Sequence, residues 1–192
     1  MAMKKYCLWA IAFGLLTVAS CKDKKPANGD IITTDYVVPT PSDTPVAMDR
    51  QSDRVEVEWI EGRTYTIVVN RVPADSLPMV ADEIGQKYKD NLVRVKVMRA
   101  DSTIFFNRTF TKSAFASWLD ADYQENAILE GMRFLKVESD ELVLTAWLNH
   151  PESGDDEAAE LRVIINKNGE VAIQRYNEND RDDLEMMERE EE

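Results

Sequence analysis

Apolar and polar residues alternate along the central part of the chain, between residues 55 and 176. In the stretch VEVEWIEG, which begins at Val55, the apolar side chains fall on one face and the glutamates on the other. The stretch LVRVKVMR, which begins at Leu92, repeats the pattern with arginine and lysine as the polar residues. A period of two residues is the repeat of a β-strand with one buried face. The pattern therefore predicts half-buried strands.

Short turn sequences separate several of these alternating runs. Asp101-Ser102, Ser139-Asp140 and Asn168-Gly169 each stand between two runs, and Asn-Gly is the strongest short hairpin signal. With strands expected at 55–60 and 63–72, the chain has about eight strands. Hairpins pair strands antiparallel, and one-sided patterning calls for a second layer. We expect a mainly β fold, with α+β as the alternative, built as an antiparallel β-sandwich or an open barrel-like sheet.

One segment, 111–132, breaks the alternation. Phe115, Trp118 and Leu119 have the spacing of a helix face, and Ile128 begins a second apolar group. We expect one or two short helices here. The segment 74–91 is interrupted by proline and glycine, so we expect a structured loop.

The N-terminal residues have the composition of an export signal. Two lysines precede an apolar run, Tyr6–Val18, which ends in Ala19 and Ser20. The run is shorter than the ~20 apolar residues that a membrane-spanning helix needs. We expect residues 1–20 to be a signal peptide, with an uncleaved membrane anchor as the alternative.

The two cysteines differ in their expected fates. Cys7 lies within the signal, so its removal leaves Cys21 without a disulfide partner. The residues Val18-Ala19-Ser20-Cys21 resemble the lipobox of bacterial lipoproteins. The resemblance implies a diacylglycerol on the Cys21 sulfur, cleavage before Cys21 and a further acyl chain, such as palmitate, on the new amine. Each buried methylene contributes about 0.8 kcal/mol, so several acyl chains hold a protein on a bilayer.

Composition divides the rest of the chain. Residues 21–54 begin with the lipidated cysteine and continue as a polar, proline-rich tether; residues 55–176 form the β domain, and residues 177–192 form an acidic tail with nine acids against two arginines. The formal charge of the chain is -13, and it becomes -15 without Lys4 and Lys5. Such a charge argues against nucleic acid as a partner. We expect a solvated tail, with cation binding as the alternative.

Five stretches carry a second resemblance. In chain order they are VADEIGQKYKDN, IFFNRTFTKSAF, AILEGMRF, HPESGDDE and NKNGEVAI. Together they resemble a family of small Bacteroides-type lipoproteins with a domain of unknown function. The resemblance covers about 55–176 and implies a Gram-negative envelope, but no reaction or ligand. Residues 22–25 lack the consecutive acids of a surface-export signal in such lipoproteins, so we expect an outer-membrane anchor that faces the periplasm rather than the cell surface.

The sequence offers few candidates for catalysis. His150 is the only histidine, and the chain has no phosphate-binding loop, nucleophile elbow or zinc motif. We therefore predict no catalytic residue, no metal and no cofactor. The acidic loop from His150 to Glu157 is either a cation site or a solvated loop. Paired acids at Asp82-Glu83, Asp120-Asp122 and Glu138-Asp140-Glu141 leave a carboxylate-dependent glycan hydrolase as an alternative.

Other residues are candidates for ligand contact or modification. Leu142, Leu144, Ala146 and Leu148 share one face of a strand, which places Trp147 on the other face, where it could contact a ligand or lie under the 111–132 helices. Ser76 and Ser102 stand in triplets that resemble an O-glycosylation sequon of Bacteroides-type exported proteins. Five basic residues form either an anion-binding groove or a solvated sheet face: Arg94, Lys96, Arg108, Arg133 and Lys136.

These observations favour a binding function. We expect a lipid-anchored envelope lipoprotein, not an enzyme, that is a binding or accessory module for a glycan, a lipid or an envelope protein. It contacts the membrane through the lipid on Cys21. The hydrolase and a purely structural envelope role are the alternatives.

Overall fold

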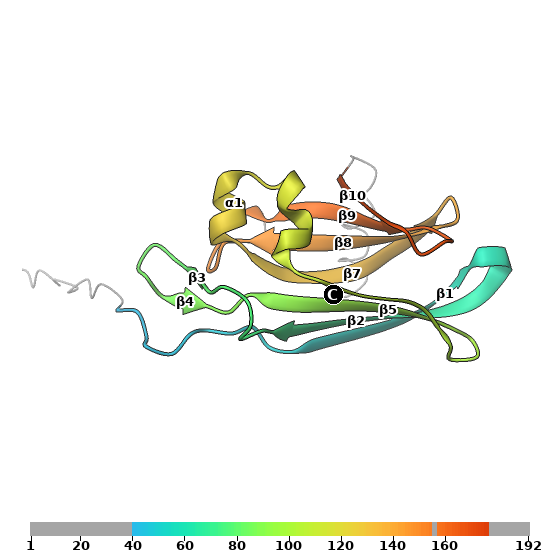
Figure 1. Ribbon diagram of the computed structural model, residues 1–192, viewed down its shortest axis with the longest axis horizontal. Helices are drawn as coiled ribbons and strands as arrows, with labels where there is room; N and C mark the ends of the chain where they lie inside the picture. Colours follow the sequence, from blue (N-terminus) through green and yellow to red (C-terminus); the bar gives the residue numbers. More distant parts are fainter. Residues whose placement is uncertain (1–39, 155–156, 177–192) are drawn as a thin grey trace, which may run out of the picture. The chain divides into compact units, whose positions relative to one another are not determined.

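The computed structural model describes residues 40–154 and 157–176. Within these ranges the chain forms two four-stranded antiparallel sheets and one two-stranded sheet (Figure 1). The first sheet, in the order β1-β2-β5-β6, consists of β1 (Gln51–Trp59), β2 (Arg63–Pro73), β5 (Asn91–Arg99) and β6 (Ile104–Phe110). The second sheet, in the order β10-β9-β8-β7, consists of β7 (Ile128–Glu138), β8 (Glu141–Asn149), β9 (Ala159–Ile165) and β10 (Val171–Arg175). The predicted mainly β fold, an antiparallel sandwich with short helices, is confirmed.

The core lies between the two large sheets. The alternating valines of β5 and the alternating residues Leu142, Leu144, Ala146 and Leu148 of β8 have no exposed surface and belong to one apolar cluster. Strand β7 also lies against β1, β2 and β5, so it closes one side of this interior. Burial of the apolar face of each sheet is the main force that holds the layers together.

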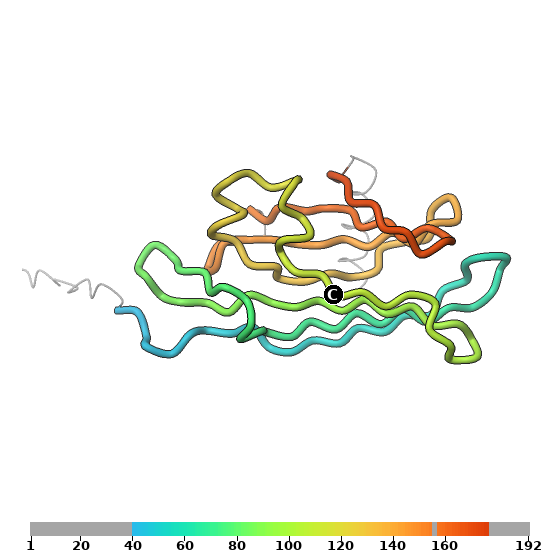
Figure 2. Tube along the Cα trace, viewed as in Figure 1, coloured from blue at the N-terminus to red at the C-terminus, as the bar shows by residue number. Residues whose placement is uncertain are grey.

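Two short helical segments connect the sheets. The 3-10 helix η2 (Lys112–Trp118) and the helix α1 (Ala121–Asn126) lie where one or two short helices were expected. Phe115 of η2 is fully buried in the core, where its ring stacks on that of Phe110 at 6.2 Å. The trace in Figure 2 runs from β6 through these helices into β7. The helical segment therefore carries the chain from the first sheet to the second and packs on the core.

The predicted hairpin turns are all present. They join β5 to β6, β7 to β8 and β9 to β10. A further 3-10 turn, η1 (Ile60–Gly62), joins β1 to β2. Ser139 and Asp140 both adopt positive φ, at 49° and 63°, as a two-residue hairpin turn of the primed type requires. Asn-Gly was therefore one of several sequences that the chain uses for tight turns.

The segment 74–91 contains a small hairpin that the sequence did not predict. Its strands β3 (Val80–Ala81) and β4 (Lys87–Tyr88) have two residues each, too few to show a period. Val46 forms a parallel bridge with Tyr88, and β1 begins at Gln51, so ordered structure starts before residue 55. The expected signal peptide, Cys21 and the acidic tail 177–192 lie outside the described residues.

Helices of the described ranges are short. None of them has the length and the apolar composition that crossing a membrane would require.

Candidate binding site

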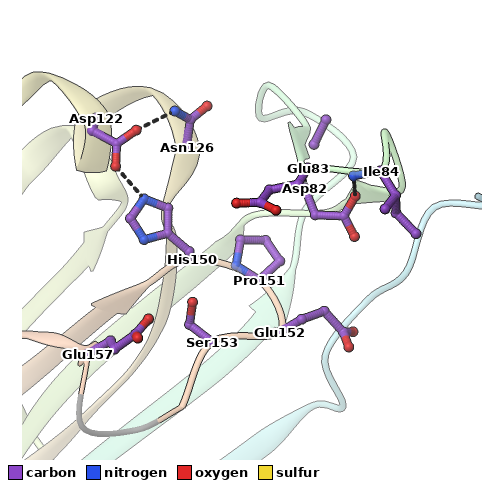
Figure 3. A pocket seen from close by; sticks show the side chains of 11 residues that line it. Asp82, Glu83, Ile84, Asp122, Asn126, His150, Pro151, Glu152, Ser153 and Glu157 are labelled. Carbon is purple, nitrogen blue, oxygen red and sulfur yellow. Dashed lines mark hydrogen bonds and ion pairs between the residues drawn. The ribbon is translucent and has the colours of Figure 1, made fainter. Parts of the chain in front are cut away.

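A pocket of about 730 Å³ lies where three segments that are distant in sequence come together (Figure 3). One side is the hairpin between β3 and β4, a second is α1, and the third is the loop that follows β8. The lining residues are Ala81, Asp82, Glu83, Ile84, Asp122, Asn126, His150, Pro151, Glu152, Ser153 and Glu157.

The capping residue of α1 fixes one wall. The Asp120 side chain accepts a hydrogen bond from the backbone nitrogen of Tyr123 at 2.9 Å, as an N-cap residue does. This start places Asp122 and Asn126 one turn apart on the pocket side, where the Asn126 amide donates to the Asp122 carboxylate at 2.7 Å. The cap therefore sets the position of the carboxylate that meets the histidine.

His150 stands between α1 and the loop after β8. Its Nε2 lies 2.9 Å from Oδ2 of Asp122, and its ring meets the ring of Tyr123 edge to face at 4.4 Å. The backbone nitrogen of His150 donates to the side chain of Asn149, which also donates to the Gly154 carbonyl. These contacts hold the imidazole in one orientation at the rim of the pocket (Figure 3).

Tyr88 links the other two walls of the pocket. Its buried hydroxyl lies 2.9 Å from Oε1 of Glu152 and 3.2 Å from Oδ2 of Asp82. Burial, followed by the hydrogen bonds to Glu152 and Asp82, raises the pKa of Tyr88 well above its ordinary value, so the phenol stays protonated. One phenolic proton therefore lies between two carboxylates from different loops.

The Asp82 carboxylate also shapes its own hairpin. Its Oδ1 accepts hydrogen bonds from the backbone nitrogens of Ile84 at 3.0 Å and Gln86 at 2.9 Å. Such a turn is a common conformation for aspartate before glycine-containing loops, and Gly85 supplies the positive φ of 86°. The turn leaves Glu83 and Ile84 exposed at the pocket rim.

The pocket is strongly acidic. Five carboxylates line it, from Asp82, Glu83, Asp122, Glu152 and Glu157, and no lysine or arginine is among the lining residues. No group of three or more histidine, cysteine or acidic side chains in the described ranges is placed to hold a metal ion. The pocket can therefore attract a cationic group and accept hydrogen bonds from it.

Sequence reasoning identified parts of this site without joining them. The acidic loop that begins at His150, the pair Asp82-Glu83 and Asp122 of the pair Asp120-Asp122 meet in one place, whereas Asp120 caps α1. The third acid group, 138–141, lies apart from the pocket at the β7–β8 turn. Tyr88 and Asn126 were missed, because neither residue type stands out in sequence; Asp155 and Asp156 lie outside the described residues.

The other candidate residues lie away from the pocket. Trp147 is half-buried on the face of the second sheet opposite the core, as expected, with the Arg133 guanidinium 5.1 Å from its ring centroid. The helical segment does not cover Trp147, because Phe115 packs in the interior cluster, on the opposite face of the sheet. Ser76 and Ser102 are exposed, and Ser102 adopts a positive φ of 66° in its turn. Ligand contact and glycosylation at these positions stay predictions.

The five basic residues do not form one groove. Arg94 and Lys96 lie on β5 of the first sheet, on the side away from the valines, whereas Arg133 and Lys136 lie on β7 of the second sheet. Arg108, on β6, is placed over the ring of Phe110. The anion-binding groove, one of the two alternatives for these five residues, is therefore not formed, because the residues belong to different layers.

Comparison with known proteins identifies the family. No curated protein matches the chain. A family model described as a domain of unknown function, DUF4738, matches residues 32–173, which include strands β1 to β9, the first part of β10 and the whole pocket. This chain therefore belongs to the DUF4738 family.

Proposed function

We propose that this protein is a lipid-anchored lipoprotein of a Gram-negative envelope whose β domain is a non-enzymatic binding module for a positively charged segment of an envelope protein. The acidic pocket around His150 carries the proposal. The lipobox-like residues that end at Cys21 support the anchor, and the proline-rich tether supports a domain held away from the lipid surface.

The charge of the pocket selects the class of ligand. With five carboxylates and no lysine or arginine among the lining side chains, the pocket attracts a lysine or arginine side chain and repels an anionic lipid headgroup. A neutral glycan fits less well, because binding sites for sugars commonly use an aromatic platform and no phenylalanine, tyrosine or tryptophan is among the lining residues. Of the three ligand classes considered, a basic protein segment matches the site best.

The contacts within the pocket favour binding over catalysis. Asp122 is engaged by His150 and Asn126, and Asp82 is engaged by Tyr88 and two backbone nitrogens. Fixed carboxylates of this kind are prearranged hydrogen-bond acceptors for an incoming cation. Carboxylates bound in this way are less available to deliver a proton to a leaving group, which is the role that a hydrolase requires of one acid.

Titration with charged peptides tests the pocket. The full chain in detergent is titrated with hexalysine, with hexaglutamate and with a neutral chitin tetrasaccharide, and the imidazole NMR signals of His150 report on the site because the chain has no other histidine. We expect hexalysine alone to shift these signals, with binding that weakens as salt rises. Saturable binding of the tetrasaccharide alone, or its cleavage, would overturn the proposal.

Matched variants separate the pocket from the general charge. The double variant Asp82→Asn/Glu83→Gln removes two pocket charges while an asparagine keeps the Oδ1 acceptor, and we expect about tenfold weaker binding of hexalysine. Glu56→Gln/Glu58→Gln makes the same change in charge on exposed positions of β1 and should leave the affinity nearly unchanged. Equal weakening by both pairs would show attraction to the acidic chain as a whole.

Metabolic labelling tests the anchor independently. A palmitate analogue should label the wild-type chain and the Cys7→Ser variant, but not the Cys21→Ser variant. Labelled protein should resist protease added to intact cells if the domain faces the periplasm. Labelling that survives Cys21→Ser would refute the anchor without bearing on the pocket.

A further inference from the structure

Arg94 and Lys96 have other basic residues near them on their own sheet. The first sheet has an outer face, which points away from the core, and the strand register arranges its side chains in rows across the strands. One row consists of Ser52, Asn70, Arg94 and Thr109. The next row consists of Arg54, Val68, Lys96 and Asn107. Arg50, which precedes β1, lines a depression together with Arg94.

This depression has a volume of about 440 Å³. Its lining residues include three arginines, Arg50, Arg71 and Arg94, and no aspartate or glutamate. Arg71 is engaged already, because its guanidinium donates to the backbone carbonyls of Glu130 at 2.6 Å and Asp49 at 3.0 Å. In a chain with a formal charge of -13, the depression is a local region of opposite sign.

The other cations of this face are available to a ligand. Within the described ranges, no ion pair or hydrogen bond involves the side chain of Arg50, Arg94 or Lys96. Arg54 lies 3.6 Å from Glu56, and both side chains are at least 60% exposed, so this pair is weak. An incoming anion therefore has no strong internal ion pair to displace.

The four available cations lie in two lines on either side of β2. These lines are Arg50 with Arg54 on the β1 side, and Arg94 with Lys96 on β5. Neighbouring strands are about 4.8 Å apart, so the two lines are separated by about 10 Å. Between them β2 contributes only shorter side chains, those of Val68, Asn70 and Val72. We call this arrangement of four cations around β2 the basic trough.

Neutral polar groups accompany the cations of the trough. They are the hydroxyls of Ser52 and Thr109 and the amides of Asn70 and Asn107. Hydroxyls and amides both donate and accept hydrogen bonds, and so do the hydroxyls of a sugar. Guanidinium groups bind carboxylates through two parallel hydrogen bonds. The trough therefore fits a ligand that carries both carboxylates and many hydroxyls.

An anionic bilayer fits this face less well. Beyond Arg54, the same side of β1 carries Glu56 and Glu58, which are both exposed. A flat anionic surface would meet these glutamates, whereas a single sugar chain can lie between the two lines of cations. The distribution of charge on the face thus favours a narrow ligand.

We propose that the basic trough binds an acidic glycan. The carboxylates of the glycan pair with Arg50, Arg94 and Lys96, and its hydroxyls bond to the neutral polar groups. Ion pairs supply the attraction, so this site needs no aromatic platform. At about 0.15 M salt, charges more than about 8 Å away are largely screened, so the cations of the trough outweigh the acids elsewhere on the chain. The trough is a second binding site, separate in its residues from the acidic pocket.

Titration of the full chain, in a neutral detergent without sugar groups, tests the site. The probes are tetragalacturonate, neutral maltotetraose and glycerol 3-phosphate, which carries the phosphate of a lipid headgroup without acyl chains. We expect tetragalacturonate alone to shift the backbone amide NMR signals of β5, in a saturable way that weakens as salt is added. The imidazole signals of His150, which report on the acidic pocket, should not move. An equal or larger response to either of the other probes would overturn the proposal.

Matched variants locate the binding. Arg94→Gln/Lys96→Gln removes two cations of the trough and should weaken binding of tetragalacturonate by at least about tenfold. Arg63→Gln/Lys167→Gln makes the same change in charge at exposed positions outside the trough and should leave the affinity nearly unchanged. Arg50→Gln, which lies outside the strands, should weaken binding several-fold even if the double variant fails to fold. Equal weakening by the two double variants, or full affinity in Arg50→Gln, would overturn the proposal.

Dilution of the protein alone distinguishes a glycan site from a contact between copies. If the trough bound the acidic pocket of a second copy, the His150 signals would depend on protein concentration, and Arg94→Gln/Lys96→Gln would remove this dependence. That result would overturn the proposal. We expect the His150 signals to be the same at all concentrations and in both double variants, which also shows that the variants are folded.

Discussion

The Asp90 carboxylate accepts a hydrogen bond from the backbone nitrogen of Leu129 at 2.8 Å, a contact that joins the start of β5 in the first sheet to β7 in the second. The neighbouring Asn91 side chain donates to the Leu129 carbonyl at 2.9 Å, so both backbone groups of Leu129 are bound by side chains. The Asp90 and Asn91 side chains thus satisfy the backbone hydrogen-bonding groups of Leu129, as a neighbouring strand would do within a sheet. The junction is next to the hairpin that forms one wall of the pocket.

Loss of the Asp90 acceptor should destabilise the domain. Asp90→Ala leaves the buried nitrogens of Leu129 and Asn91 without their acceptor, and we expect the free energy of unfolding to fall by about 1–3 kcal/mol. Urea denaturation measures this change. Asp53→Ala, at an exposed position of β1, is the control and should change stability by less than about 0.5 kcal/mol.

The Asp90→Asn variant should change how stability depends on pH. Burial raises the pKa of Asp90, although the two backbone hydrogen bonds and Lys112 partly oppose this shift. The folded state therefore holds the Asp90 proton more tightly than the unfolded state, so this contribution to stability is full below pH 3.8 and is lost as pH rises through the folded pKa. Asparagine keeps an acceptor and does not titrate. Stability of Asp90→Asn relative to wild type should therefore rise with pH above 3.8 and then level off, and a constant difference would contradict the argument.

Glu138 should make the opposite contribution. Its Oε2 accepts a hydrogen bond from Arg162 at 2.7 Å, and this bond, followed by that with Lys136, lowers the pKa of Glu138. The contribution to stability is present above pH 4.5 and is lost as pH falls through the lowered folded pKa. Because the Glu138 side chain is 45% exposed, water screens the interaction, and we expect Glu138→Gln to cost about 1 kcal/mol at pH 7.

Acid titration of stability checks the Glu138 prediction. The difference between wild type and Glu138→Gln should shrink below pH 4.5, whereas Glu56→Gln, on the exposed face of β1, should show little difference at any pH. If the stability difference between wild type and Glu138→Gln grew as the pH fell, the predicted direction of the pH dependence would be wrong.

The strands were predictable because the polarity of the side chains along a strand follows the environment of each of its two faces. Val93, Val95 and Val97 alternate with polar residues because one face of β5 meets the core and the other meets solvent. The turn at Asn168-Gly169 was predictable for a similar reason, since local backbone geometry decides which residues fit. Two-residue strands such as β3 carry no period, so the small hairpin could not be predicted.

The pocket was not predictable, because no local rule brings its three walls together. Asp82, Asp122 and His150 come from a hairpin, a helix and a loop, and contacts between the layers determine how close they lie. The sequence shows acid pairs in many segments and gives no reason to join these particular ones, and the position of the Tyr88 phenol between two of them depends on tertiary packing alone. Candidate residues could thus be named before their common site.

The β7–β8 turn offers a stabilising substitution. Asp140 adopts a φ of 63°, in the left-handed region that glycine enters without steric cost, and its backbone carbonyl rather than its side chain accepts the bond from Trp59 at 2.9 Å. Asp140→Gly should therefore keep this bond and raise the melting temperature by a few degrees, about 0.5–1 kcal/mol in stability. Asp101→Gly is the control: it removes two hydrogen bonds to Thr103 and should lower stability. Equal effects of the two glycines would refute the argument.

Tyr88 should be essential to the stability of the pocket walls and should not ionise in mild alkali. Tyr88→Phe removes the hydroxyl that bonds both Asp82 and Glu152, and we expect the free energy of unfolding to fall by about 1–3 kcal/mol at pH 7. The folded state favours the neutral phenol, so this stability is full below pH 10.0 and is lost as pH rises through the raised folded pKa. Ultraviolet difference titration should accordingly show the same tyrosinate signal near pH 10 in Tyr88→Phe and in wild type.

Tyr65→Phe, whose ring keeps its edge contact with Trp59 at 5.1 Å, is the matched control for stability. If Tyr88→Phe removed a tyrosinate signal near pH 10, the phenol would not be held protonated, and the linkage of the two loops through Tyr88 would be refuted.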